Sequence, residues 1–414
     1  MRYSFCLYRA VRPERLHAFA SGSLIRQTGG DVMIYLDHAA TTPMAGPVAA
    51  SMEPYYAKDY ANASTIYEFG ERSRQAVEHA RAVIARSLHA QADEIYFTAG
   101  GSESDNWALK GTAEAYKEKG RHIITTQIEH HAVLHTCKYL EQQGYEVTYL
   151  PVDGQGFVQL QQLEEAIRPD TILISVMFAN NEIGTLEPVA QIGRIARRHG
   201  IVFHTDAVQA YAQIPINVDF YHIDLLSASG HKFYGPKGTG FLYIRDGVKT
   251  ASFIHGGGQE QGRRAGTENV PGIVGIGTAA ELAMRTMSDR MYRETRLRDW
   301  MIHTIQNRIP GAWLNGDRYA RLPNNVNFSF EQIEGETLLL LLDAKDICAS
   351  AASACSTGST EPSHVLTAIG REPELAAGTL RMTLGEATTW EEIQTAAEAV
   401  VENVQLLREV ARME

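Results

Sequence analysis

The sequence predicts an α/β protein: a large domain with a doubly wound, mainly parallel sheet, and a second, smaller α+β domain. The first observation is that short apolar runs alternate with stretches of helical periodicity from about residue 70 onward. The second is a change after about residue 280 to a long charged helix, two short strands and a C-terminal helix from Trp390. Alternating strands and helices form parallel sheets that helices cover on both faces.

The elements of the large domain follow from local patterns of apolar residues. Apolar runs of strand length predict strands at 94–98, 122–126, 171–178, 201–205, 224–228 and 240–244. Helical spacing of apolar residues predicts helices at 71–88, from Ser102, at 160–167 and at 189–199. We place the large domain at 46–285, the small domain at 286–414, and an N-terminal segment that joins the small domain at 33–45.

Residues 1–32 differ in composition from the rest of the chain. They hold five arginines against Glu14 and Asp31, whereas the whole chain has a formal net charge of -11. An arginine-rich, acid-poor leader is typical of an organellar transit peptide. The interpretation that we favour is that Met33 is the true start and that 1–32 are upstream sequence outside the fold.

Charge and cysteine content exclude several classes of function. The negative charge argues against nucleic acid or an anionic membrane surface as partner. The richest apolar run, 338–342, is far too short to cross a bilayer. Cys6, Cys137, Cys348 and Cys355 are too few and too scattered for a disulfide framework, which predicts a reducing, cytoplasmic location. We expect no stable metal site, because the cysteine spacing matches none and no histidine pair completes one.

A lysine in a glycine-rich turn is the first candidate for chemistry. Lys232 follows the expected strand end at Ser229, and Gly230 and the Gly235-Pro236 turn predict close backbone approach around it. A lysine held out of water has a lowered pKa and can form a Schiff base. The alternative is an ordinary lysine of a surface loop.

The ends of two more expected strands carry groups that suit a phosphate and a pyridine nitrogen. Gly100-Gly101 and Ser102 precede a helix, whose first amides with the Ser102 hydroxyl form an anion site suited to phosphate. Ser102 and Asp105 alternatively form a capping box. Asp206 ends another strand, where a carboxylate can keep a pyridine nitrogen protonated, or can simply cap a loop.

A cysteine in a segment of small residues is the candidate nucleophile. Cys355 lies in 346–360, which is too polar and too rich in small residues to be core. A cysteine in a flexible loop is available as a thiolate, although an inert small residue is the alternative. Cys348 follows Ile347 at an expected strand end, where a packed side chain is the better interpretation.

These segments, in this order, resemble the cysteine desulfurases of the class V aminotransferase family, which are fold type I pyridoxal-phosphate enzymes. The similarity runs from Met33 to the C-terminus. The most specific matches are Ser229-Gly-His-Lys232 with Gly235-Pro-Lys-Gly238, Asn180-Asn-Glu-Ile-Gly184, and Ser353-Ala-Cys355. The long loop up to Glu361-Pro-Ser363 resembles the group that supplies iron–sulfur assembly more than the shorter-loop group that includes selenocysteine lyases.

The resemblance implies a role for each matching residue. Lys232 would carry the cofactor as an internal aldimine and shuttle the substrate proton, Cys355 would accept the sulfur, and His130 would stack on the cofactor ring and act as acid or base. The other implied contacts are Asp206 with the pyridine nitrogen, Gln209 and Asn181 with the phenolic oxygen, Gly101, Ser102, Ser229 and His231 with the phosphate, Thr267 of a second subunit with the same phosphate, and Arg381, together with Asn181, with the substrate.

The implied function is pyridoxal-phosphate-dependent removal of sulfur from L-cysteine, which gives L-alanine and a persulfide on Cys355. The acceptor would be a protein such as an iron–sulfur scaffold, or another thio-cofactor pathway, and Cys355 would touch a nascent cluster only in transit. The Thr267 match implies a homodimer. The alternatives are a selenocysteine lyase, a cysteine β-lyase or an aminotransferase of the same fold, or a non-catalytic sulfur-assembly scaffold, against which the intact site residues argue.

The chain departs from the family pattern at three places. Ser102 stands where threonine is usual, which keeps the hydroxyl. Ala352 stands where glycine is frequent. The family's Asn-Pro-Ser-Ser-x-His stretch reads Asn62-Ala-Ser-Thr-Ile-Tyr67, which affects the expected substrate entrance. The sequence leaves open the physiological acceptor and the use of selenocysteine.

Overall fold

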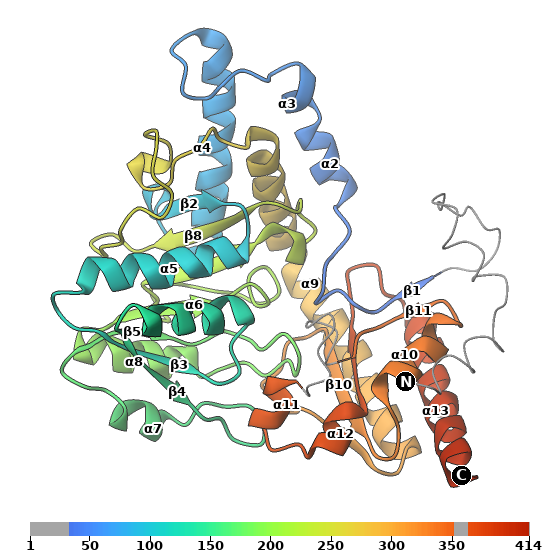
Figure 1. Cartoon of the computed structure of the whole chain (residues 1–414). Helices are drawn as coiled ribbons and strands as arrows, with labels where there is room; N and C mark the ends of the chain where they lie inside the picture. The colour runs from blue at the N-terminus through green and yellow to red at the C-terminus, as the bar shows by residue number, and fades with distance from the viewer. Residues whose placement is uncertain (1–32, 352–362, 414) are drawn as a thin grey trace. The chain divides into compact units, whose positions relative to one another are not determined.

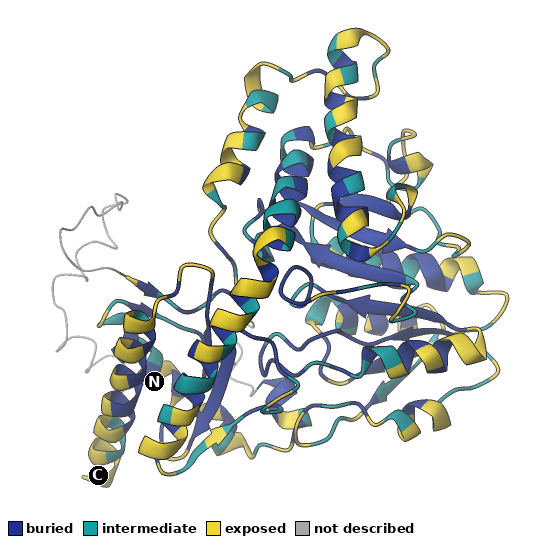
Figure 2. Ribbon diagram, turned by 180° about the vertical axis from the view of Figure 1, so that it is seen from behind, coloured by how far each residue is buried: buried dark blue, intermediate teal, exposed yellow. Residues whose placement is uncertain are grey.

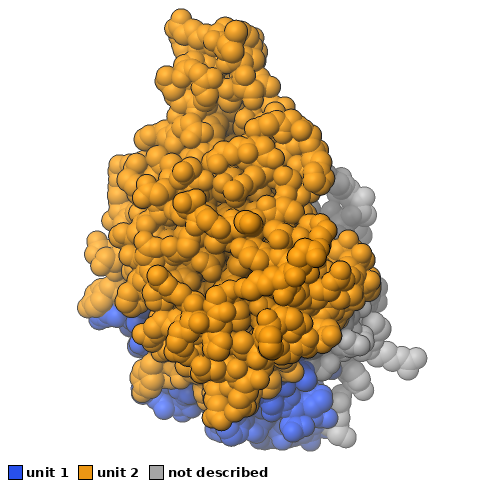
Figure 3. All heavy atoms as spheres, turned by 90° about the vertical axis from the view of Figure 1, so that its left-hand side faces the viewer, with its two compact units in different colours: residues 1–38, 293–315, 324–414 blue, residues 39–292, 316–323 orange. Residues whose placement is uncertain are grey.

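The structure is a computed structural model that describes residues 33–351 and 363–413. The chain divides into two compact units (Figure 3). We call the one formed by 39–292 and 316–323 the large unit, and the one formed by residues up to 38, 293–315 and 324–414 the small unit. The division falls inside a long helix, close to the predicted domain boundary at 285/286 but not at it.

The large unit is built on a seven-stranded sheet in the order β2-β8-β7-β6-β5-β3-β4 (Figure 1). Its strands are β2 (Ile95–Thr98), β3 (His122–Thr126), β4 (Glu146–Leu150), β5 (Thr171–Ser175), β6 (Val202–Asp206), β7 (Leu225–Ser229) and β8 (Gly240–Ile244). The five strands from β3 to β7 pair in parallel, and only β8 runs antiparallel to its neighbours β7 and β2. The predicted mainly parallel sheet is therefore confirmed.

Helices cover both faces of this sheet. Its helices are α2 (Gly46–Met52), α3 (Pro54–Ala57), α4 (Glu68–Leu88), α5 (Gly101–Tyr116), α6 (His131–Gln142), α7 (Leu160–Glu165), α8 (Val189–His199) and the first part of α9 (Val270–Arg308). One core joins α5 and α6 to residues such as Val202, and the other joins α4, α8 and α9 to residues such as Phe203. Neighbouring strand residues thus enter opposite cores, which is the period-two alternation of a strand. Apart from the edge strand β4, the strands themselves are buried (Figure 2).

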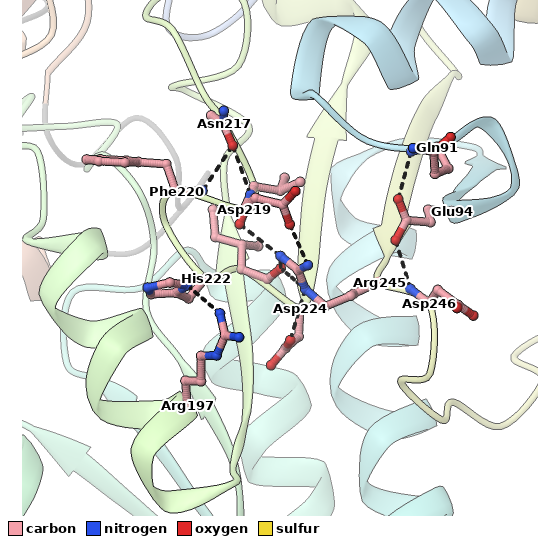
Figure 4. A network of polar contacts seen from close by, with 12 residues as sticks. Gln91, Glu94, Arg197, Asn217, Asp219, Phe220, His222, Asp224, Arg245 and Asp246 are labelled. Carbon is pink, nitrogen blue, oxygen red and sulfur yellow. Dashed lines mark hydrogen bonds and ion pairs between the residues drawn. The ribbon is translucent and has the colours of Figure 1, made fainter.

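A polar network holds the amino ends of the two central parallel strands (Figure 4). Arg245, which follows β8, donates to the Asp219 carboxylate over 2.6 Å and to the Val218 carbonyl over 3.0 Å. Asp224 accepts a hydrogen bond from the Phe203 amide at 2.9 Å, at the start of β6. These contacts fix β6 and β7 at the end opposite to Asp206 and Ser229, where the predicted chemistry lies.

The small unit has its own sheets and core. A three-stranded antiparallel sheet has the order β12-β10-β9, and a parallel pair joins β1 to β11. Its elements are β1 (Ile34–Tyr35), β9 (Ala312–Leu314), β10 (Asn325–Phe330), α10 (Gly335–Asp343), β11 (Ile347–Cys348), α11 (His364–Ala368), α12 (Pro373–Ala377), β12 (Thr379–Thr383) and α13 (Trp390–Arg412). The predicted helix from Trp390 is confirmed, and a capping box of Thr389 and Glu392 explains its start.

Three expectations about elements were wrong. The strand expected over 171–178 ends at Ser175. The edge strand β4 was missed, because its residues are mostly half-exposed and form no apolar run. The small unit has four strands after residue 310, not two. Among the helices of the described residues, none is long and apolar enough to span a bilayer.

Candidate active site

Lys232 lies in a tight turn directly after β7. The Gly235 amide donates to the Gly230 carbonyl at 3.0 Å, and a Cβ on Gly230 would come within 2.9 Å of the Thr239 hydroxyl and within 3.0 Å of the Pro236 carbonyl. The turn therefore needs glycine at this position, as the sequence predicted. The Lys232 ammonium group donates to the carbonyl oxygens of Ala39 at 2.6 Å and Ala40 at 2.8 Å. Lys232 is thus an anchored, half-buried lysine, not an ordinary surface one.

Asp206 ends the neighbouring strand β6 and is buried. Burial raises the pKa of Asp206 to about 6, although the Val208 amide and the positive charge of Lys232 act in the opposite direction. The Val208 amide donates to its carboxylate at 2.9 Å. Gln209 donates its side-chain N–H to the Ala39 carbonyl at 3.0 Å, the oxygen that Lys232 also uses. Three of the predicted site residues, Asp206, Gln209 and Lys232, are therefore brought together.

The predicted phosphate turn lies between β2 and α5. Gly100 has φ 152° and ψ -178°, a conformation that is essentially restricted to glycine. A Cβ on Gly101 would lie 2.6 Å from Val208 and 3.6 Å from the Ser229 side chain, so this turn packs against the segment after Asp206 and the end of β7. The first amides of a helix have no intrahelical acceptor, and they can bind an anion here.

The alternative interpretation of this turn, a capping box of Ser102 and Asp105, is wrong. The residue that caps α5 is Gly100, and Ser102 is already the second helical residue, with an exposed side chain. Asp105 is only 1% exposed and faces the interior. The carboxylate near the helix start is instead Glu103, which accepts from the Ala99 amide at 2.9 Å and pairs with Arg264 at 2.9 Å.

Two histidines take up defined states around this site. His130 caps α6 by accepting the Ala132 amide on Nδ1 at 3.1 Å, which places the proton of a neutral ring on Nε2. The His231 ring pairs with the Thr41 hydroxyl at 3.1 Å. Burial and the neighbouring charges of Lys232 and Lys237 lower the pKa of His231 to about 4. Near neutral pH His231 is therefore neutral and would meet a phosphate as a hydrogen-bond donor.

Asn181 and Thr267 sit in well-defined loops of the large unit. Asn181 is half-buried, and the preceding Asn180 side chain accepts the Glu182 and Ile183 amides at 2.9 and 3.0 Å. This turn fixes the backbone on either side of Asn181. Thr267 is exposed.

Arg381 belongs to the small unit, in β12. It is 3% exposed, and its guanidinium group pairs with Asp37 at 2.8 Å. Its backbone pairs with that of Ser350 through bonds of 2.7 and 3.0 Å. Cys355, with Ser353, lies outside the described residues, and Cys348 is half-buried at the end of β11, next to β1.

Several groups of the site were not singled out from the sequence. The Ala39 and Ala40 carbonyls act through the backbone, and the only local signal is the pair of small residues that lets Lys232 approach. Glu129 is fully buried, accepts from Thr126 at 2.8 Å and from the Met177 amide at 2.9 Å, and burial raises its pKa well above the ordinary value. Among the described residues, no cluster of three or more potential metal ligands is present.

Comparisons with known proteins agree with one another. The profile of the aminotransferase class-V family matches residues 34–395. The cysteine desulfurase IscS of Methanosarcina thermophila is 55% identical over 378 residues, which cover 91% of this chain and 93% of that protein. The cysteine desulfurase IscS of Dictyoglomus turgidum is 52% identical over 378 residues, with 91% and 96% covered.

Solved structures give the same result. A NifS-like protein superposes with a TM-score of 0.85 at 38% identity, covering 91% of this chain and all of that one. A structure described as SspA in complex with cysteine superposes with a TM-score of 0.73 at 40% identity, covering 85% of this chain and 98% of that one.

Proposed function

The chain belongs to the aminotransferase class-V family, and we propose how its residues carry out the reaction for which its relatives are named. Those relatives are cysteine desulfurases that align with this chain over nearly their whole length. The chain is accordingly a cysteine desulfurase, an enzyme that removes sulfur from L-cysteine. The observation that carries the proposed site is that Lys232 and Gln209 share the Ala39 carbonyl, while the positive charge of Lys232 acts on the buried Asp206.

The residues of the large unit fit pyridoxal phosphate. An amine follows β7, a buried carboxylate ends β6, and a glycine turn with helix-start amides follows β2, which suits the aldehyde, the pyridine nitrogen and the phosphate of that cofactor. When bound, the cofactor would supply an electron sink for the carbon next to the substrate amine. The proposed contacts are Lys232 with the aldehyde carbon, Asp206 with the pyridine nitrogen, Gln209 and Asn181 with the phenolic oxygen, Gly101, Ser102, Ser229 and His231 with the phosphate, and Thr267 of a second subunit with the same phosphate.

Lys232 and His130 are the proposed proton carriers. Lys232, whose ammonium group is held by the Ala39 and Ala40 carbonyls, would bind the cofactor, and its free amine would take the Cα proton of the substrate. The His130 ring would lie against the cofactor and can donate from Nε2, because its Nδ1 accepts the Ala132 amide. The Asp206 carboxylate would keep the pyridine nitrogen of the bound cofactor protonated.

Arg381 and Cys355 complete the reaction in this proposal. The Arg381 guanidinium binds the substrate carboxylate, for which a planar fork of donors is well suited. The Cys355 thiolate attacks the substrate sulfur. The S–S bond forms as the C–S bond breaks, the released electron pair goes to the substrate carbon, and protonation there gives alanine. The sulfur stays on Cys355 as a persulfide.

The destination of the sulfur and the assembly state are further parts of the proposal. A protein acceptor such as an iron–sulfur scaffold fits the long segment around Cys355, since a tethered carrier raises the effective concentration at the acceptor. Thr267 is exposed, which supports a homodimer in which each chain completes the phosphate site of the other. With its net charge of -11 and four scattered cysteines, the protein fits a cytoplasmic location without a nucleic-acid or membrane partner.

The test is sulfide release from L-cysteine in the presence of dithiothreitol, with the visible band of the cofactor recorded in parallel. We expect Cys355→Ala to keep the band and to release almost no sulfide. The matched control is Cys348→Ala, because Cys348 is a cysteine at the end of β11. This variant should keep both the cofactor band and the release of sulfide. Full sulfide release by Cys355→Ala would overturn the persulfide mechanism in favour of a β-lyase.

A further inference from the structure

A row of polar side chains runs inward from Asp206 on the face of the sheet that α5 covers. Asp206 and His204 are two apart on β6 and therefore share this face, where Val202 joins the apolar core beneath α5. Ser227 lies beside them on β7, where it is the partner of Asp206 in the strand register. All of these side chains are buried. The polar row thus has to satisfy itself without bulk water.

His204 is the centre of this row and is neutral. Its Nδ1 pairs with the Ser175 hydroxyl at 2.9 Å and its Nε2 with the Ser227 hydroxyl at 3.0 Å. Burial lowers the pKa of His204 to about 3. Although the Asp105 carboxylate lies 3.7 Å from Nε2, His204 brings no positive charge to balance it.

Asp105 reaches the same place from α5. Its Oδ1 atom is buried and has no hydrogen-bond partner among the residues that the structure describes. Burial is the largest cause that raises the pKa of Asp105 well above its ordinary value, and the negative charges of Asp206 and Glu129 add to it. The Ser227 hydroxyl acts in the opposite direction.

Asp206 and Asp105 are not equivalent carriers of negative charge. Two buried carboxylates that interact strongly share protons instead of both ionising. Asp206 accepts the Val208 amide and lies near the Lys232 ammonium group, whereas the acids that act on Asp105 are Asp206 and Glu129, both of which raise its pKa. The negative charge is therefore more stable on Asp206.

We propose that Asp105 is a positioning residue whose carboxyl group keeps the proton of the Asp105/Asp206 pair, so that Asp206 is the ionised member facing the pyridine nitrogen. The inference rests on the proposed cofactor site. Asp105 acts through Asp206 and does not itself reach the cofactor. The Ser227 hydroxyl orients it, and the negative charge of Asp206 disfavours a second negative charge there.

The direct test is infrared difference spectroscopy of the full-length, cofactor-loaded protein near neutral pH. The C=O stretch of a protonated carboxyl group should be present in the wild type and should lose one component in Asp105→Asn, while carboxylate absorption stays unchanged. Glu129→Gln is the matched control, because Glu129 is a second buried carboxyl with a raised pKa and should remove a separate component. Loss of carboxylate absorption in Asp105→Asn would overturn the proposal.

Ser227→Ala tests the same assignment without altering either carboxyl group. Because the Ser227 hydroxyl lowers the pKa of Asp105, its removal should raise the pH at which the Asp105 component disappears. A midpoint that falls or stays in place would contradict the pairing. If the chain did not hold pyridoxal phosphate at all, the visible band would be missing from the wild type, whereas an error in the Asp105 assignment leaves that band intact.

Discussion

Lys232 and Gln209 donate hydrogen bonds to the same acceptor, the carbonyl oxygen of Ala39, over 2.6 and 3.0 Å. The acceptor lies more than 150 residues before either donor in the sequence. These bonds hold the Lys232 ammonium group at the carboxyl ends of β6 and β7, close enough to Asp206 for its positive charge to act on that carboxylate. A cofactor that captures this amine would take over a site whose polar groups are already oriented.

The raised pKa of Asp206 predicts a stability effect with a definite sign. Its folded-state pKa is about 6 against an ordinary value of 3.8, so the folded chain binds this proton more tightly than the unfolded chain. The free energy of unfolding should therefore fall as pH rises between these two pKa values, and it should stay lowered at higher pH. We expect Asp206→Asn to stabilise the cofactor-stripped protein by about 3 kcal/mol at pH ~7, and much less near pH ~4.

Thermal melting at the two pH values checks this prediction. Asp93→Asn is the control, since Asp93 is an exposed carboxyl group and its replacement should leave the difference between the two pH values unchanged. A stripped Asp206→Asn protein that melts below the wild type at neutral pH would contradict it. The same variant should lose most of its desulfurase activity, because a neutral amide cannot keep the pyridine nitrogen protonated.

Gly101→Ala should weaken cofactor binding by steric conflict. The added Cβ would lie 2.6 Å from Val208, so the phosphate turn would have to move away from the segment that carries Asp206. Overpacking of this kind costs about 1–3 kcal/mol, which corresponds to a Kd raised roughly 5- to 150-fold. Cofactor titration measures the change.

Two further variants decide whether the cause is steric. Gly46→Ala is a matched control, because nothing lies within 4 Å of a Cβ at that position. Adding Val208→Ala to Gly101→Ala removes the conflicting methyl group and should restore much of the affinity. Failure of this rescue would mean that the turn needs glycine for another reason.

The inner strands of the sheet were predictable where burial on both faces makes the sequence apolar throughout, as in β8. The edge strand β4 was not predictable in this way, since its exposed side leaves no apolar run. Asp105 was misinterpreted for a different reason. Its spacing from Ser102 fits a cap, and only the packing of α5 on the sheet shows that the carboxyl group points inward. Contacts such as that of Lys232 with Ala39 join distant segments and leave no local signature.

Arg381→Lys should raise the KM for cysteine with a smaller effect on kcat. Lysine keeps the positive charge but offers a single donor group instead of a planar fork, so one hydrogen bond to the substrate carboxylate is lost. A hydrogen bond to a charged group is worth about 1.5–3 kcal/mol, which predicts a KM raised roughly 10- to 100-fold. Steady-state kinetics of sulfide release measure it.

The matched control for Arg381 is Arg371→Lys, in the same unit. Arg371 is half-buried and donates to the Asn315 side chain at 2.7 Å and to the Leu314 carbonyl at 3.0 Å. Its replacement should change stability without changing the KM. Equal effects of both variants on the KM would show that the Arg381 result reflects a general loosening of the small unit and not a lost contact with the substrate.

The buried ion pair of Arg81 and Glu260 should stabilise the fold and also hold in place the segment that bears Thr267. Arg81 donates to the Glu260 carboxylate through bonds of 2.8 and 3.0 Å, and Glu260 also accepts the Phe97 amide of β2 at 2.9 Å. Glu260 and Gln261 both have positive φ, so these contacts hold the backbone in a strained conformation that it would otherwise leave.

Glu260→Gln leaves the Arg81 charge buried without its counter-charge, at a cost of about 3–5 kcal/mol. The exposed pair of Lys117 and Glu114 provides the control, because Glu114→Gln should cost at most about 1 kcal/mol. Differential scanning calorimetry should therefore show a clear loss for Glu260→Gln only. Cofactor should also dissociate faster from that variant, because the released segment no longer presents Thr267 in a fixed place. If both variants melted alike, the ion pair would not be what holds this segment.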